Sequence, residues 1–340
     1  MSNGSTENGL LPMLKREGVL LNVSIRFWRG HKKLKAQDLG LDPNNVSDRL
    51  VSLGHKRLMP KEALAPLVLI EGQAHALVEQ NSFPFLNGLA RFVPNARLAT
   101  VTAKLKELET EFWNAKGLFL RHYEKHRATA TREWCEMAQR LSTDPVSLVA
   151  AVEGAFPETL RLEQSFGFST QLFQIAVPES LSLRLLAEGE QQAVLEARRQ
   201  AAQEATRHIR QSTEGFVREC VASLREQTVL LCDEVLATIR TGKTDGVHQK
   251  TLNRLAKFMD QFKTMNFAND QELETTLENA RLELLSHTAA EYRDNAHAQN
   301  QLTEGLTRLR DTAREMARQD ATEIVQRFGE MGKRKFHLAA

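Results

Sequence analysis

Proline is missing from the whole C-terminal half of this chain. All nine prolines lie at or before Pro178, so the 162 residues from Glu179 to Ala340 contain none. Proline breaks a helix because it lacks a backbone N–H and its ring clashes with the preceding turn. The same half is rich in helix-favouring Leu, Ala, Glu, Gln and Arg. These features predict long helices, whose apolar stripes must be buried against another helix or a partner.

Cysteine and long apolar runs are also scarce. The three cysteines, Cys135, Cys220 and Cys232, form no CxxC pair, which predicts reduced thiols rather than a disulfide framework. No apolar run approaches the roughly 18 residues that a membrane span requires. The polar opening MSNGSTENGLLPML also lacks the pattern of a secretory signal. We therefore expect a cytoplasmic protein with no membrane association.

The fold class predicted from these patterns is mainly α. It consists of a long antiparallel, coiled-coil-like helical hairpin and a small antiparallel β element from the N-terminal half. Apolar residues at helical spacing predict helices over 60–80, 95–140, 181–240 and 247–264, and a last helix capped by Asp270. β-branched and aromatic residues predict strands over 19–28 and 166–177, with a hairpin around Asn87-Gly88 over 82–93.

Composition divides the chain into four predicted parts. These are a flexible N-terminus at 1–17, a mixed helix/strand head at 18–178, a helical stalk or hairpin at 179–330 and a basic tail at 331–340. Residues 1–60 carry ten Lys/Arg against five Asp/Glu, whereas residues 270–330 carry seven against thirteen. The basic and acidic regions could attract each other, within one chain or between copies. Solvated surface is the alternative explanation of both.

A heptad-like row on the long helix predicts a helix-pairing interface. One side of the pair runs from Val217 to Val235 and the other lies on the last helix. The residues that we assign to it are Val217, Val221, Leu224, Leu231, Val235, Leu302, Leu306 and Leu309.

The segment Gly242-Lys243-Thr244 imitates the end of a phosphate-binding loop. Such a loop needs a strand before it and a glycine where this chain has Ala237. Here a predicted helix precedes the loop, so we interpret Gly242 and Gly246 as a helix stop and a turn. The pair His122 and His126 has a zinc-like spacing but no third ligand nearby, and a solvated face is the preferred interpretation. We predict no enzyme activity, no cofactor and no metal.

The basic stretch from Arg26 to Lys35 is the best candidate for nucleic-acid contact. Cations there would neutralise phosphates and Trp28 could stack on a base. A solubilising, lysine-rich strand edge is the alternative. The candidate residues are Arg26, Trp28, Arg29, Lys32, Lys33 and Lys35.

Several short motifs carry a family resemblance. The opening VLLNVSIRFWRGHKKL at 19–34 is followed by LGHKRL at 53–58, FPFLNG at 83–88 and the helix containing Phe112-Trp113 and Phe119-Leu120-Arg121-His122-Tyr123. Together they resemble an uncharacterised bacterial and phage family, domain of unknown function 3150, over roughly residues 18–330. The resemblance supplies no catalytic residues, because the family has no established activity.

The resemblance also implies a setting. Genes of this family tend to lie in phages and mobile elements, close to a MoxR-type AAA+ ATPase and a protein with a von Willebrand-type domain. We therefore expect a non-enzymatic scaffold or adaptor that works with such an ATPase. A homo-oligomer through the helix-pairing row is a further expectation. The alternative function is a nucleic-acid-binding accessory protein in recombination or DNA processing.

Overall fold

The computed structural model describes residues 7–42, 52–85, 88, 90–174, 192–241, 247–285, 287–319 and 321–336. The chain forms two compact units whose segments alternate along the sequence. Unit 1 contains Met1–Leu21, Asn81–Ala99 and Leu172–Ala340, and unit 2 contains Asn22–Gln80 and Thr100–Gln171. The predicted head at 18–178 and stalk at 179–330 are single stretches. In the structure, α1 (Glu7–Glu17), β4 (Phe83–Phe85) and β5 (Ala90–Pro94) from the N-terminal half belong to unit 1. The difference arises because long-range packing groups these elements with the C-terminal helices.

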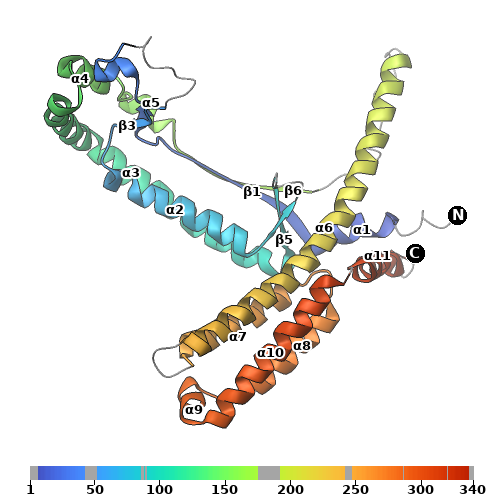
Figure 1. Cartoon of the computed structure of the whole chain (residues 1–340). Helices are drawn as coiled ribbons and strands as arrows, with labels where there is room; N and C mark the ends of the chain where they lie inside the picture. The colour runs from blue at the N-terminus through green and yellow to red at the C-terminus, as the bar shows by residue number, and fades with distance from the viewer. Residues whose placement is uncertain are drawn as a thin grey trace. The chain divides into compact units, whose positions relative to one another are not determined.

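Unit 1 is built from helices that share one apolar core. The helix α6 packs along α10, α10 packs on α8, and α7 packs on α8 (Figure 1). The helices of this unit are α1 (Glu7–Glu17), α6 (Gln192–Thr241), α7 (Gln249–Met265), α8 (Gln271–Leu284), α9 (Ala289–Asp294), α10 (Ala296–Arg318) and α11 (Thr322–Phe336). The mainly α fold class is thus confirmed, and α6 pairs with a helix from the end of the chain.

The last helix is not continuous, contrary to the prediction from Asp270 onward. The helical structure is interrupted between α8 and α9, between α9 and α10, and between α10 and α11. Thr288 and Glu291 form a capping box that starts α9, and the Asn295 side chain accepts hydrogen bonds from the backbone N–H groups of His297 and Ala298 at the start of α10. Such caps satisfy the donors that a helix start leaves unpaired, so new helices can begin at these points.

The N-terminal residues are also more ordered than predicted. A flexible start was expected at 1–17, but α1 spans Glu7–Glu17 and packs on α11. The side chains of Leu10, Leu11, Met13 and Leu14 are buried. The backbones approach closely, since a Cβ on Gly9 would collide with the carbonyl oxygen of Gly329. An apolar face buried against a distant helix therefore stabilises helical structure over Glu7–Glu17.

A small sheet joins elements that are distant in sequence. Its strand order is β4-β5-β1-β6, with β1 antiparallel to β5 and β4 antiparallel to β5. The strands are β1 (Gly18–Arg26), β4 (Phe83–Phe85), β5 (Ala90–Pro94) and β6 (Gly167–Phe173). This confirms the predicted antiparallel β element. Pro84 lies on the edge strand β4, where its missing N–H costs no ladder bond. Asn87 of the predicted hairpin turn lies outside the described residues, and Gly88 has φ +85°.

A buried ion pair lies within unit 1. Arg225 on α6 donates through Nε to the Asp270 carboxylate at 2.8 Å and through Nη1 to the carbonyl oxygen of Met316 on α10. The Asp270 carboxylate also accepts from the backbone N–H of Leu273 in the first turn of α8. The two charged side chains are only 4% and 3% exposed. The pair therefore joins α6, α10 and the start of α8.

Unit 2 holds an aromatic core on the long helix α3 (Asn95–Leu141), which begins in unit 1. Phe112 is completely buried and contacts Phe27 and Phe168, with ring centroids 6.4 and 5.7 Å apart. Tyr123 is also buried, and its hydroxyl donates to the Pro157 carbonyl at 2.8 Å. Burial raises the pKa of Tyr123 to about 12. The other elements of unit 2 are β2 (His31–Lys33), η1 (Ala36–Leu39), β3 (His55–Arg57), α2 (Lys61–Gln80), α4 (Pro145–Glu153) and α5 (Thr159–Glu163).

Within the described ranges, no helix combines the length and the apolar character needed to cross a membrane.

Candidate nucleic-acid interface

Two short basic segments form one antiparallel ribbon in unit 2. The strand β2 carries His31-Lys32-Lys33 and β3 carries His55-Lys56-Arg57, so every residue in both strands is Lys, Arg or His. The register pairs His31 with Arg57, Lys32 with Lys56 and Lys33 with His55. We call these six residues the basic ribbon. Because side chains alternate across a strand, the pairs of His31 and of Lys33 share one face, opposite the Lys32–Lys56 pair.

One face of the basic ribbon is anchored to the rest of unit 2. Lys56 is buried, and its Nζ lies 2.9 Å from the Asp38 carboxylate of η1. The indole Nε1 of Trp134 on α3 donates to the Arg57 carbonyl at 2.7 Å. Backbone hydrogen bonds from Leu34 to Gly54 and from Leu58 to Gly30 extend the strand pairing beyond the ladder. These contacts hold the ribbon in a fixed position.

The opposite face presents charge to solvent. The side chains of His31, Lys33, His55 and Arg57 are all exposed, as is that of Lys32. Asp38 is already paired with Lys56. Glu71 on α2 is paired with Arg29, which donates two hydrogen bonds to it at 2.6 and 2.5 Å. Such a row of exposed cations is the feature that binds phosphate backbones.

The structure separates the predicted contact residues into two groups. Lys32, Lys33 and Lys35 are exposed on the ribbon or directly after it. Arg29 is held by Glu71, which raises the pKa of Arg29 and lowers that of Glu71. The guanidinium of Arg29 also lies 4.0 Å from the centre of the Phe27 ring. These contacts engage the guanidinium of Arg29 within unit 2.

Trp28 and Arg26 take structural positions. The Trp28 ring packs against Tyr123 and Phe156, with centroids 6.0 and 6.4 Å apart. It therefore packs against the core of unit 2 while part of its surface stays exposed. Arg26 lies at the end of β1, where its side chain covers the backbone of Gly167.

The second strand of the basic ribbon, β3, was not predicted from the sequence. The residues His55 and Arg57 lie on the exposed face beside the predicted stretch, although 24 positions separate His31 from His55. The signal that could have found them is the similarity of the tripeptides His-Lys-Lys and His-Lys-Arg. Each is too short to show strand periodicity, so the sequence alone could not reveal that they pair.

The predicted helix-pairing residues are all inside unit 1. They lie on α6 and α10, and every one is buried in a single hydrophobic cluster. Val217 and Leu306 are completely buried. The helix-pairing row therefore packs α6 against α10 within the chain, and its side chains are covered by that packing.

Two motifs remain, the loop Gly242-Lys243-Thr244 and the pair His122 and His126. Gly242-Lys243-Thr244 lies outside the described residues. His122 and His126 lie on one face of α3, and the His126 ring stacks on Phe119. In the part of the chain that the structure describes, no three His, Cys, Asp or Glu side chains are placed to hold one metal ion.

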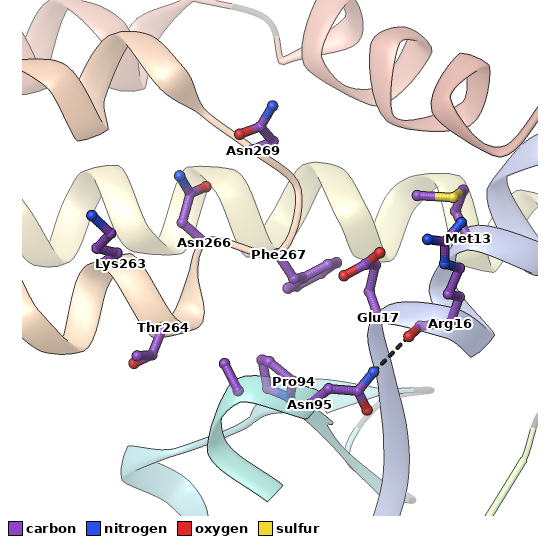
Figure 2. Close-up of a pocket in the computed structure, with 11 residues that line it drawn as sticks. Met13, Arg16, Glu17, Pro94, Asn95, Lys263, Thr264, Asn266, Phe267 and Asn269 are labelled. Carbon is purple, nitrogen blue, oxygen red and sulfur yellow. Dashed lines mark hydrogen bonds between the residues drawn. The ribbon is translucent and has the colours of Figure 1, made fainter. Parts of the chain in front are cut away.

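Unit 1 also contains a cavity of ≈490 Å³ (Figure 2). It lies between the end of α1, the start of α3 and the turn from α7 to α8. Its polar groups hold these elements together. Asn95 donates to the Arg16 carbonyl, Lys263 pairs with Glu278, and Asn266 binds the Asp270 backbone. We therefore interpret the cavity as a joint between elements.

A larger groove of ≈740 Å³ lies between α2 and α3 in unit 2. Leu67 and Phe119 are buried side chains of its wall, whereas Trp113 and Leu118 are 40% and 48% exposed. Exposed apolar side chains gathered at a groove are typical of a protein-binding surface.

Comparison with known proteins gives a family but no described activity. No curated protein matches the chain, and no solved structure matches it. One family model matches residues 16–291, which covers most of the sequence and includes the whole basic ribbon and the groove. The chain therefore belongs to the family described as a protein of unknown function, DUF3150.

Proposed function

We propose that this protein binds the phosphate backbone of nucleic acid through the basic ribbon. The observation that carries the proposal is the row of exposed cations on an anchored two-stranded ribbon. Lys33 and Arg57 lie on the solvent-facing side of the ribbon, Lys32 is exposed on the other side, and Lys35 lies two residues after β2. The neighbouring carboxylates of Asp38 and Glu71 are already paired. Phosphates are then the anions best suited to these cations.

The expected ligand is a duplex bound without sequence preference. A two-stranded ribbon fits the major groove of double-stranded DNA. The ribbon carries no Phe, Tyr or Trp side chain, and its two imidazole rings, those of His31 and His55, pack edge-to-face on each other. Stacking on aromatic side chains is the usual means of holding single strands. Contacts to the backbone fix position and supply affinity, but they do not read base sequence.

Charge reversal on the ribbon tests the proposal. Replacing Lys33 and Arg57, which share the solvent-facing side of the ribbon, together by glutamate is expected to weaken duplex binding at least about 100-fold at 0.1 M salt, since each lost phosphate contact costs roughly tenfold there. The measurement is fluorescence anisotropy of a labelled duplex over a salt series. Contacts from Lys33, Arg57 and Lys35 predict a slope of log affinity against log salt of about −2 to −3 for the natural protein.

The matched control reverses two exposed lysines on α3. Lys104 and Lys106 lie in the same unit, away from the ribbon strands. Replacing both by glutamate makes the same change in net charge and should reduce the affinity much less. Equal losses in the two double variants would show that net charge alone governs binding, and the ribbon would then have no special role.

A second candidate function is a protein-binding adaptor, which the groove between α2 and α3 favours. The partner expected from the family resemblance is a MoxR-type AAA+ ATPase. Trp113 and Leu118 are the exposed apolar side chains of the groove wall. Buried aromatic anchors commonly dominate an interface. Replacing both residues by serine should therefore weaken binding to the purified ATPase roughly tenfold or more.

This second proposal has its own control. Val146 and Leu160 are exposed apolar residues on α4 and α5, outside the groove. Their replacement by serine should leave the interaction unchanged in a surface-binding assay. If the natural protein forms no complex with the ATPase, or if both double variants bind as it does, the adaptor function through this groove is excluded.

A further inference from the structure

Two histidines lie together on the exposed face of the basic ribbon. His31 and His55 come from different strands, and their ring centroids are 5.1 Å apart with an interplanar angle of 86°. Both side chains are exposed. The Nδ1 atom of His31 lies 3.1 Å from the Arg29 carbonyl oxygen. Because a carbonyl only accepts, Nδ1 donates there, and Nε2 is the atom of His31 that can take a second proton.

The surroundings of this pair are cationic. Arg57 lies opposite His31 in the register, and Lys33 lies opposite His55, so two positive side chains share the face with the two rings. On the other side of the ribbon Asp38 pairs with Lys56, and beside it Glu71 pairs with Arg29. A phosphate placed beside an imidazole favours its protonated form.

We infer that His31 and His55 are phosphate-contacting residues that act in their protonated form, so that the ribbon takes up protons when it binds a nucleic-acid backbone. This inference rests on the proposed function of the ribbon. Imidazole is the side chain whose charge ordinarily changes between pH 5 and 8. By linkage, an event that takes up protons becomes more favourable as the pH falls.

Lowering the pH should make duplex binding depend more steeply on salt concentration. Each added phosphate contact steepens the slope of log affinity against log salt by about 0.9. Two protonated imidazoles should therefore steepen the slope by up to about 1.8 between pH 8.0 and pH 5.5. At 0.1 M salt the same change corresponds to duplex binding that is roughly 10- to 100-fold tighter at the lower pH.

The experiment measures anisotropy of one labelled duplex at pH 8.0 and 5.5, each over a salt series. The natural protein should show the steeper slope at pH 5.5, and His31→Gln with His55→Gln should remove most of that difference. Replacing His122 and His126 on α3 by glutamine is the matched control, and this variant should keep the full response. Calorimetry in buffers of different ionisation enthalpy should also detect proton uptake by the natural protein at pH 6.5.

The outcomes separate the inference from the proposed function. A natural protein without salt-dependent binding at pH 8.0 would exclude the ribbon as a nucleic-acid site altogether. Salt-dependent binding at pH 8.0 whose slope does not change at pH 5.5 would overturn only the role of the histidines. The same holds if the His31 and His55 variant responds to pH as strongly as the His122 and His126 variant. Circular dichroism of all variants at both pH values establishes that they are folded.

Discussion

Replacing Arg225 by methionine is expected to lower the free energy of unfolding of unit 1 by about 3–5 kcal/mol. The guanidinium of Arg225 pairs with Asp270, and both side chains are almost fully buried. Removing the cation leaves the Asp270 carboxylate without its partner in a place that water does not reach, and the Met316 carbonyl also loses a donor. The effect is large because a buried charge costs far more when it is alone than when it is paired.

An exposed pair supplies the control for this prediction. Arg254 donates to Glu234 at 2.8 Å, but the two side chains are 61% and 55% exposed. Exposed ion pairs contribute at most about 1 kcal/mol, so Arg254→Met should change the free energy of unfolding by no more than that. Urea unfolding followed by circular dichroism at 222 nm measures both variants. Similar shifts for both would contradict the assigned importance of the buried pair.

A double-mutant cycle identifies the interaction itself. Asp270→Asn keeps an oxygen that can cap α8 but removes the charge that faces Arg225. If the pair accounts for the loss, the two single changes should not add when they are combined, because each already breaks the same interaction. Additive losses would instead mean that Arg225 and Asp270 stabilise the unit independently.

Replacing Phe112 by alanine is expected to destabilise unit 2 by about 3–5 kcal/mol. The ring is completely buried and contacts Phe27 on one side and Phe168 on another. Truncation removes the apolar area of a phenyl ring and leaves a cavity among side chains that cannot collapse into it freely. The same core holds Trp28, which lies three residues before the basic ribbon begins at His31.

Tryptophan fluorescence reports this second change selectively. The chain has three tryptophans, Trp28, Trp113 and Trp134, and all of them lie in unit 2. The midpoint of urea unfolding followed by fluorescence should therefore fall strongly in Phe112→Ala. Leu118→Ala is the control, because Leu118 is 48% exposed on the same helix and should cost only about 0.5 kcal/mol. A midpoint shift no larger than that of the control would refute the prediction.

Local sequence signals predicted the long elements of the fold well. The helix expected at 95–140 is observed as Asn95–Leu141, and the one expected at 247–264 as Gln249–Met265. Both have apolar residues at regular helical spacing over many turns, without an internal proline. The strand expected at 19–28 is observed as Gly18–Arg26. These elements carry their own pattern, so no distant partner had to be known.

The missed elements depend on partners far away in sequence. The helix α1 has only 11 residues and includes Pro12, and an isolated helix of that length is marginal in water. Burial of the apolar face of α1 against α11 stabilises α1, and no local sequence pattern predicts that α11 is its partner. The breaks after Leu284 and Asp294 are set by short caps inside a stretch of otherwise helical composition.

The basic ribbon was also predicted only in part from the sequence. Its first strand was recognised from the basic stretch that includes Lys32 and Lys33, because charge density is visible in a sequence. The engagement of Arg29 by Glu71 was not visible, and neither was the burial of Lys56 against Asp38. Charge counting alone cannot tell a paired cation from an available one, because pairing is decided by tertiary contacts.

The packing of α1 on α11 has a consequence for how the chain is made. The ribosome synthesises α1 before α11, the helix that packs on it, which lies about 300 residues later. At roughly 5–20 residues per second, α1 waits about 15–60 s before its partner exists. During that time its apolar face is uncovered and open to chaperones or to other nascent chains. Any early stop that removes α11 would leave this face uncovered permanently.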